Sequence, residues 1–240
     1  MNMASKNGVI GGSTGLRLGR CMTAACVAAA MGCATVAQAV DVPITNGGFE
    51  QPVVVPGSFT SGNGITGWDL LTTSTPNGVI YTGVWNPQGT LPNAVRVGDQ
   101  VGYSNGGVLS QTLGATAQEG TRFTLTYRMI HRAGFAPFGR VRLYAGNVVL
   151  GEVIETPSNR PAVNGFAERT IDVTVPAGSA TIGQSLRIEI DTRGSTQTVF
   201  DDFRLEAGNA ASDCPADLTE DGVVDDADFV IFQERYNEFT

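Results

Sequence analysis

The chain has 240 residues, which is enough for one medium-sized domain with appendages, and its formal net charge is −8 at pH 7. Its 31 glycines and its modest aromatic content of 8% suit many short strands joined by turns. An acidic chain repels polyphosphate, so we expect no nucleic-acid partner.

The first 39 residues have the pattern of a secretory signal peptide. Arg17 and Arg20 precede the small, apolar run CMTAACVAAAMGCATV, and the sequence AQA follows at 37–39. A basic region, a short hydrophobic region and a small-x-small cleavage site are typical of exported proteins. No other segment is apolar enough over a sufficient length to span a bilayer. We therefore expect a secreted or cell-surface chain that begins near Val40 and has no transmembrane segment.

Cysteine usage agrees with export. Cys21, Cys26 and Cys33 leave with the signal peptide, and only Cys214 remains. An odd cysteine in an exported protein is a free thiol, forms an intermolecular bond or has its partner elsewhere. These alternatives stay open, whereas an internal disulfide framework is excluded.

From residue 40 onward, period-2 alternation predicts short strands. In the segment RFTLTYRM, for example, Phe123, Leu125, Tyr127 and Met129 point one way and the residues between them point the other way. Strands with one apolar face must bury those faces against one another, which predicts an all-β, jelly-roll β-sandwich over residues 40–206, followed by a linker at 207–213. The predicted strands are 78–85, 107–113, 122–129, 141–145, 170–175, 185–191 and 198–205.

Five short segments in a fixed order resemble the galactose-binding-like carbohydrate-binding modules. They are NGGFE at 46–50, GW at 67–68, GVLSQTL at 107–113, GTRFTLTYRM at 120–129 and FDDFRL at 200–205. The resemblance covers about residues 44–206 and implies a sandwich that binds carbohydrate or another cell-surface polymer. It also implies a structural calcium ion between the first and last strands, at Glu50 and Asp201.

Asp201 is notable on physical grounds as well. Alternation in the last strand places Val199, Asp201, Phe203 and Leu205 on one face. A carboxylate in an apolar row is costly to bury unless it is hydrogen-bonded or bound to a cation. A strand cap or a salt bridge to an arginine is the alternative to calcium.

Sugar-binding modules combine an aromatic ring that stacks on the sugar with a few polar groups that donate and accept hydrogen bonds. Tyr144 shares a polar strand face with Arg142 and so points away from the predicted core. For each aromatic residue, packing in the core or at an edge is the alternative. The candidate ligand-binding residues are Tyr144, Arg142, Arg128, Trp85 and Tyr103.

No residue pattern indicates catalysis. The chain has a single histidine, His131, and no GxSxG nucleophile elbow. The sequence leaves a two-carboxylate glycosidase open as an alternative, because that chemistry needs only two acids at a suitable separation.

The acidic tail contains a calcium-loop pattern that begins at Asp217. An EF-hand-type loop carries oxygen ligands at positions 1, 3, 5, 7, 9 and 12 and glycine at position 6, which is Gly222 here. An aspartate at position 12 and a helix on one side only resemble one repeat of a Cys-Pro-type dockerin, over 214–240. The expected calcium ligands are Asp217, Thr219, Asp221, Val223 through its carbonyl, Asp225 and Asp228.

The dockerin resemblance implies a cohesin-like protein or a second dockerin-like repeat as partner. In the helix after the loop, Phe229, Phe232, Tyr236 and Phe239 form an apolar stripe that one repeat cannot bury alone. Taken together, the sequence favours an exported, non-catalytic, calcium-binding protein that binds carbohydrate and is anchored by its tail. The alternatives are a structural or adhesive surface protein without a sugar ligand and a small polysaccharide-degrading enzyme.

Overall fold

The computed structural model describes residues 39–60, 64–71, 74–75, 78–79, 81–209, 218 and 225–237. The predicted signal peptide, apart from Ala39, and Cys214 lie outside these residues. No helix among the described residues is long and apolar enough to cross a membrane.

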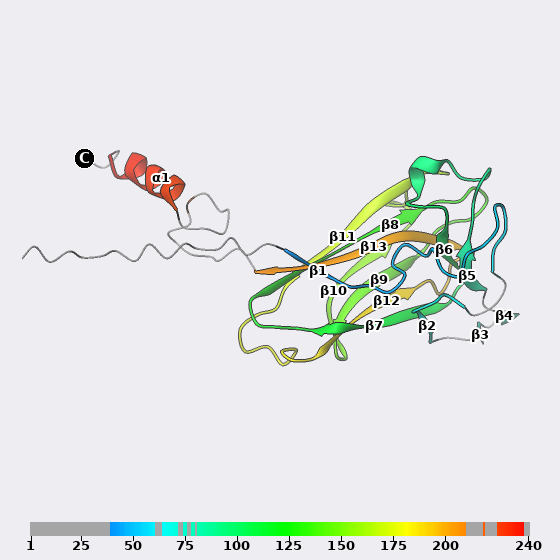
Figure 1. Cartoon of the computed structure of the whole chain (residues 1–240), viewed down its shortest axis with the longest axis horizontal. Helices are drawn as coiled ribbons and strands as arrows, with labels where there is room; N and C mark the ends of the chain where they lie inside the picture. Colours follow the sequence, from blue (N-terminus) through cyan, green and yellow to red (C-terminus); the bar gives the residue numbers. More distant parts are fainter. Residues whose placement is uncertain are drawn as a thin grey trace, which may run out of the picture. The chain divides into compact units, whose positions relative to one another are not determined.

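Two antiparallel sheets lie face to face (Figure 1). The first sheet has the order β11 (Phe166–Thr174), β8 (Thr121–Ile130), β13 (Thr198–Asn209), β6 (Val101–Ser104) and β5 (Thr82–Trp85), and β1 (Val40–Val42) also pairs with β13. The second has the order β10 (Val148–Glu155), β9 (Gly139–Ala145), β12 (Ser185–Asp191), β7 (Val108–Thr116) and β2 (Asp69–Leu70). The remaining described elements are the pair β3 (Ser74–Thr75) and β4 (Gly78–Val79), the 3₁₀ helix η1 (Asn93–Val95) and the helix α1 (Asp226–Asn237).

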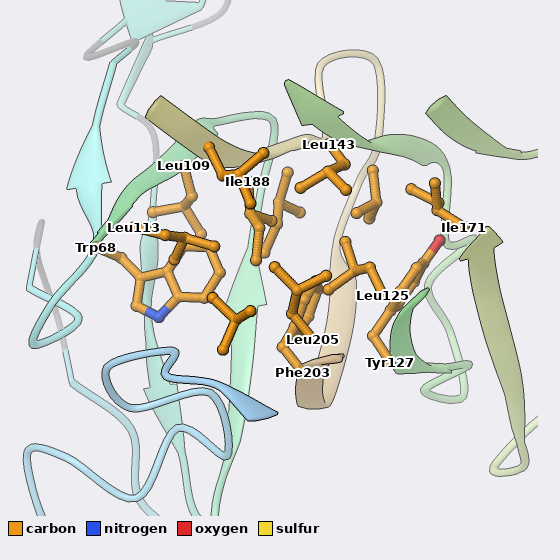
Figure 2. Packing of buried hydrophobic residues seen from close by; sticks show 14 of the residues in the cluster. Trp68, Leu109, Leu113, Leu125, Tyr127, Leu143, Ile171, Ile188, Phe203 and Leu205 are labelled. Carbon is orange, nitrogen blue, oxygen red and sulfur yellow. The ribbon is translucent and has the colours of Figure 1, made fainter. Parts of the chain in front are cut away.

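The prediction of an all-β sandwich is confirmed at this level. Apolar side chains from both sheets meet between the layers, as Figure 2 shows for Leu125 and Tyr127 of β8 opposite Leu143 of β9 and Ile188 of β12. The alternation in β8 is the cause, because Phe123, Leu125, Tyr127 and Met129 are buried there while the residues between them are partly exposed. Strand β13 continues to Asn209, so it includes the first three residues of the expected linker.

A β-bulge interrupts the alternation of β13. The pairing with β8 shifts between Asp201 and Arg204, so that Asp202 and Phe203 together oppose Tyr127, and Asp202 has a φ of 56°. Phe203 therefore enters the core, while Val199 lies in a separate cluster. The prediction that Val199, Asp201, Phe203 and Leu205 share one face is wrong for this reason.

The bulge brings an aromatic group together in the core. The ring of Phe203 lies 4.9 Å from that of Tyr127, 5.6 Å from that of Trp68 and 5.9 Å from that of Phe49, between centroids. Its backbone N–H donates to the carbonyl oxygen of Gly47 at 3.0 Å. The segment that leads into the first sheet is thus fixed to the bulge by both packing and hydrogen bonding.

A second apolar cluster forms on the outer face of the first sheet. The chain between β5 and β6, which contains η1, supplies part of it. The candidate functional site lies next to this cluster and shares Trp85 and Tyr103 with it. Its members are Trp85, Leu91, Val95, Val101, Tyr103, Ile130 and Val199.

Replacement of Phe203 tests whether the bulge supports the fold. Phe203→Ala removes a buried ring with four aromatic neighbours, and we expect it to lower the free energy of unfolding by about 3–5 kcal/mol. Urea unfolding followed by circular dichroism measures the change. The matched control is Val163→Ala, at an exposed position, with an expected change within about 0.5 kcal/mol. A cost of Phe203→Ala no larger than the control's would contradict the role of the bulge.

Candidate functional site

An aromatic pocket of about 460 Å³ lies at one end of the first sheet, beside the second apolar cluster. We call it the aromatic pocket throughout. Its volume is in the range of small-molecule sites. The residues that line it are Phe59, Tyr81, Trp85, Tyr103, Asn105, Arg132 and Gln197.

Strand register explains why its polar residues meet. Val199 of β13 pairs with Tyr103 of β6 on one side and with Ile130 of β8 on the other, so these three form one row across the sheet. Because side chains repeat every second residue on one face, the next positions outward are Gln197, Asn105 and Arg132. These are the polar residues that line the pocket.

The aromatic residues form a buried floor and an exposed rim. Trp85 and Tyr103 are only 5% and 4% exposed, whereas Phe59 and Tyr81 are 61% and 48% exposed. Phe59 reaches the pocket because its segment pairs with the edge of β5. The backbone N–H of Thr60 donates to the carbonyl oxygen of Val84 at 2.8 Å, and Phe59 forms a β-bridge with Trp85.

A chain of hydrogen bonds joins the three polar residues. Arg132 Nη1 donates to Gln197 Oε1 at 2.7 Å, and Gln197 Nε2 donates to Asn105 Oδ1 at 3.1 Å. Since a guanidinium can only donate, Gln197 must present its oxygen to Arg132 and its nitrogen to Asn105. The amide nitrogen of Asn105 is left as a further donor.

The positive charge of Arg132 lies in apolar surroundings. Its guanidinium carbon is 4.4 Å from the ring centroid of Trp85 and 4.7 Å from that of Phe135. Burial lowers the pKa of Arg132, and burial likewise raises the pKa of Tyr103, whose hydroxyl donates to the carbonyl oxygen of Thr60 at 2.6 Å. Among the described residues, no carboxylate lines the pocket or forms an ion pair with Arg132.

The five candidate sugar-binding residues do not form one site. Trp85 and Tyr103 lie in the aromatic pocket, and their role in binding stays a prediction. Tyr144 is buried beneath the guanidinium of Arg187, 3.9 Å from its ring centroid, so its ring is not an open platform. Arg142 is paired with Glu189 on the same sheet at 2.7 Å.

Arg128 lies elsewhere again. Its guanidinium covers the ring of Phe166 at 4.5 Å and pairs with Asp202 at 3.7 Å. The pocket residues that the sequence analysis missed are Phe59, Asn105, Arg132 and Gln197. Only the pairing of β6, β8 and β13 could have identified Asn105, Arg132 and Gln197, because nothing local distinguishes them.

Glu50 and Asp201 hold the same loop. Glu50 Oε1 accepts hydrogen bonds from the backbone N–H groups of Asp99 and Gln100 at 3.0 and 3.1 Å, and Asp201 Oδ2 accepts one from Val97 at 2.7 Å. Burial, with added repulsion from Asp202 and Glu50, raises the pKa of Asp201 to about 7. Among the described residues, no three carboxylate, histidine or cysteine side chains form a metal-binding group, so calcium here stays a prediction.

In the tail, Asp217, Thr219, Asp221 and Val223 lie outside the described residues. Asp225 and Asp228 form a reciprocal cap at the start of α1. Asp225 Oδ1 accepts from the N–H of Ala227, and Asp228 Oδ2 accepts from the N–H of Asp225, each at 2.8 Å. The described residues thus show a capped helix and do not show a calcium loop. The tail's cohesin-like partner and the export of the chain stay predictions.

Comparison with known proteins gives a different class of function from the one expected. The family model for the HpiC1-like proteins, described as HpiC1 cyclase, matches residues 40–206. The search of curated proteins found no match.

Among solved structures, the chain is similar to a Stig cyclase, Fisc, from Fischerella sp. TAU, bound to (3Z)-3-(1-methyl-2-pyrrolidinylidene)-3H-indole. The identity is 26%, the match covers 72% of this chain and 99% of that one, and the TM-score is 0.59. A cyclase from Fischerella sp. TAU in complex with 4-(1H-indol-3-yl)butan-2-one is 25% identical over 71% and 98% of the two chains, with a TM-score of 0.59.

Carbohydrate-binding modules are also among the similar structures. The xylan-binding module CBM22-1 from Paenibacillus barcinonensis is 15% identical over 65% and 99% of the two chains, with a TM-score of 0.40. That likeness is too weak to carry a functional argument.

These findings correct the predicted function. The prediction of a non-catalytic protein whose function is to bind carbohydrate and calcium is wrong, because the family match and the Stig cyclase structures point to an enzyme, a cyclase. The calcium site at Glu50 and Asp201 is a separate prediction that these comparisons do not test. The assignments to dockerins and to polysaccharide breakdown have no support, and the family match ends at residue 206, before the tail. The sequence analysis missed the enzyme because the aromatic pocket contains no motif of known catalytic spacing.

The raised pKa of Asp201 predicts a pH-dependent stability. Between about pH 4 and pH 7 the folded state holds a proton on Asp201 that the unfolded state has lost, so the free energy of unfolding falls as the pH rises. We expect urea unfolding in the presence of EDTA to show a loss of roughly 1–3 kcal/mol between pH 5 and pH 8 that Asp201→Asn abolishes.

The control for this slope is Asp172→Asn. The hydrogen bond from Arg122 lowers the pKa of Asp172, so that carboxyl is charged in both states across this range. The variant should therefore keep the wild-type slope. Equal slopes in wild type and Asp201→Asn would contradict the assignment to Asp201. A slope that vanishes when calcium is added to wild type would support the predicted calcium site at Glu50 and Asp201.

The close approach of β5 to the rim segment predicts a cost at Gly83. An added methyl group there would lie 3.0 Å from the carbonyl oxygen of Thr60 and closer still to its hydroxyl. We expect Gly83→Ala to displace the segment that carries Phe59 and to lower the free energy of unfolding by about 1–3 kcal/mol, measured by urea unfolding. At Gly114 of β7 the added methyl group meets no atom within 4 Å, so Gly114→Ala should be neutral. Equal effects of the two changes would show that the contact with Thr60 is unimportant.

Proposed function

Because the chain belongs to the HpiC1-like cyclase family, we propose that it is a cyclase that closes a ring on an indole-class substrate held in the aromatic pocket. The observation that carries the proposal is the pocket itself, with its buried floor of Trp85 and Tyr103 and its open rim of Phe59 and Tyr81. The similar cyclase with a bound indolyl ketone supports the choice of an indole-class ligand.

The geometry suits an enzyme that folds a flexible substrate. Ring closure requires two ends of one molecule to meet, and a rigid pocket that favours the folded conformer supplies much of the rate enhancement through orientation. The floor is rigid because Trp85 belongs to β5 and Tyr103 is held by its hydrogen bond to Thr60. An aromatic substrate ring would meet these buried rings at their edges, and it can stack on the exposed rings of Phe59 and Tyr81.

The polar groups lie where they can act on the substrate. Tyr81 and Tyr103 carry hydroxyl groups at the rim and at the floor, and Arg132, Gln197 and Asn105 supply donors at the polar end. A proton that the ring closure moves can pass to or from one of the hydroxyls. The apolar floor keeps water away from the part of the substrate that covers it, which limits side reactions there.

Binding of 4-(1H-indol-3-yl)butan-2-one tests the pocket. We expect isothermal titration calorimetry to detect binding to wild type, and we expect Tyr81→Ala, which changes the exposed rim and spares the core, to weaken it by about threefold to tenfold. Phe166→Ala, at an aromatic residue outside the pocket lining, should leave it unchanged.

Turnover tests the reaction. Incubation with an indole that carries a flexible unsaturated side chain should give a product of unchanged mass with one more ring and one fewer double bond, detected by mass spectrometry and proton NMR. If the folded protein neither binds nor converts any of a panel of such indoles, the proposed function is wrong.

A further inference from the structure

The charge of Arg132 is not neutralised within the part of the chain that the structure describes. The other partly buried arginines differ: Arg142 pairs with Glu189, Arg169 with Glu155 and Arg187 with Glu189. Among the described residues, the guanidinium of Arg132 donates a hydrogen bond to the amide oxygen of Gln197 and lies over the rings of Trp85 and Phe135. A guanidinium in apolar surroundings without a carboxylate partner favours the entry of an anion.

The polar end of the pocket offers hydrogen-bond donors from a second residue as well. Because Arg132 donates to Gln197 and Gln197 donates to Asn105, the amide nitrogen of Asn105 remains as a donor. Arg132 itself uses one N–H on Gln197 and retains others for a ligand. The polar end of the pocket therefore offers donors from two residues and carries a net positive charge.

The stacking of Arg132 prepares it for this role. The planes of Trp85 and Phe135 limit the movement of the guanidinium, so little freedom is lost when a ligand binds to its edge. A carboxylate matches the fork of donors on that edge and can accept two parallel hydrogen bonds. A cationic ligand would instead meet like charge in a poorly solvated site.

On the basis of the proposed function, we propose that the substrate of the aromatic pocket carries a carboxylate beside its aromatic ring, and that Arg132 binds this carboxylate. The aromatic part occupies the floor at Trp85 and Tyr103, and the carboxylate lies at the polar end. Arg132 is thus the residue that selects aromatic acids over neutral or basic aromatic compounds.

Three probes of matched shape test the selection: 3-indolepropionate, 3-indolepropanamide and tryptamine. We expect calorimetry at low ionic strength to show binding of the propionate roughly tenfold tighter than that of the amide, with tryptamine the weakest. The preference should shrink as sodium chloride is added, because it is electrostatic.

Substitution then assigns the preference to one side chain. Arg132→Gln should bind the propionate and the amide with equal affinity, while Arg132→Lys should keep part of the preference. Arg160→Gln removes an exposed arginine outside the pocket lining and should keep all of it. Thermal melts confirm that each variant is folded.

The outcomes separate this inference from the proposed function. Binding of the amide and the propionate with equal affinity by wild type, or a preference that survives Arg132→Gln, overturns the selection of a carboxylate and leaves the indole pocket intact. A preference for tryptamine also overturns it. Failure of all three probes to bind wild type overturns the proposed occupant of the pocket itself.

Discussion

The β-bulge in β13 is the constraint on which both the core and the aromatic pocket depend. Without the extra residue, the side chain two positions after Phe200 on the core face would be that of Asp202, and the carboxylate would enter the apolar layer. With it, Phe200 and Phe203 both lie in the core, and Gln197 and Val199 keep the opposite face, where the pocket forms. The left-handed backbone at Asp202 is unfavourable by itself. The packing of Phe203 against Tyr127, Trp68 and Phe49 offsets it, so the order of the core and the placement of Gln197 depend on the same strand.

Charged side chains form ion pairs on the second sheet, whereas two buried or partly buried ionisable groups on the side of the first sheet have no partner of opposite charge among the described residues. This difference helps to distinguish groups that stabilise the fold from groups that bind a ligand. On the outer face of the second sheet, Arg142 and Glu189 neutralise each other. On the first sheet, Asp201 has two backbone donors and a pKa raised to about 7, while Arg132 has aromatic rings and one amide oxygen in place of a carboxylate. Charged groups that only stabilise a fold are usually paired as Arg142 and Glu189 are. Charged groups without a partner of opposite charge mark sites of binding or reaction. Of the two, only Arg132 lines a pocket.

The alternation of apolar residues predicted the two sheets, whereas the pairing of distant strands determines which residues meet in the aromatic pocket. Alternation predicted β8, β9, β11 and β12 because each has one regular apolar face, and it predicted β13 despite the bulge within that strand. It missed β10, where the pairing with β9 shifts between Val149 and Gly151, and β6, which has only four residues. It also wrongly assigned Phe203 and Leu205 to the face of Val199 and Asp201, since the bulge after Asp201 leaves no clear mark in the sequence. Trp85 and Tyr103 were recognised as ligand candidates by residue type alone. Arg132, Gln197 and Asn105 could not be recognised, because strands far apart in the chain bring them together.

Burial of the aromatic residues distinguishes a sugar platform from an enclosed enzyme site on a sandwich of this kind. A sugar-binding surface presents the face of an exposed ring, and hydroxyl groups of the sugar require both donors and acceptors around it. In this chain Trp85 and Tyr103 are almost fully buried, so they form the floor of a pocket and do not present an open ring face. The polar end offers mainly donors, from Arg132 and Asn105. The presence of aromatic residues alone fits both a sugar-binding surface and an enzyme pocket. The depth of the rings and the sign of the polar end favour a planar, anionic aromatic ligand over a sugar.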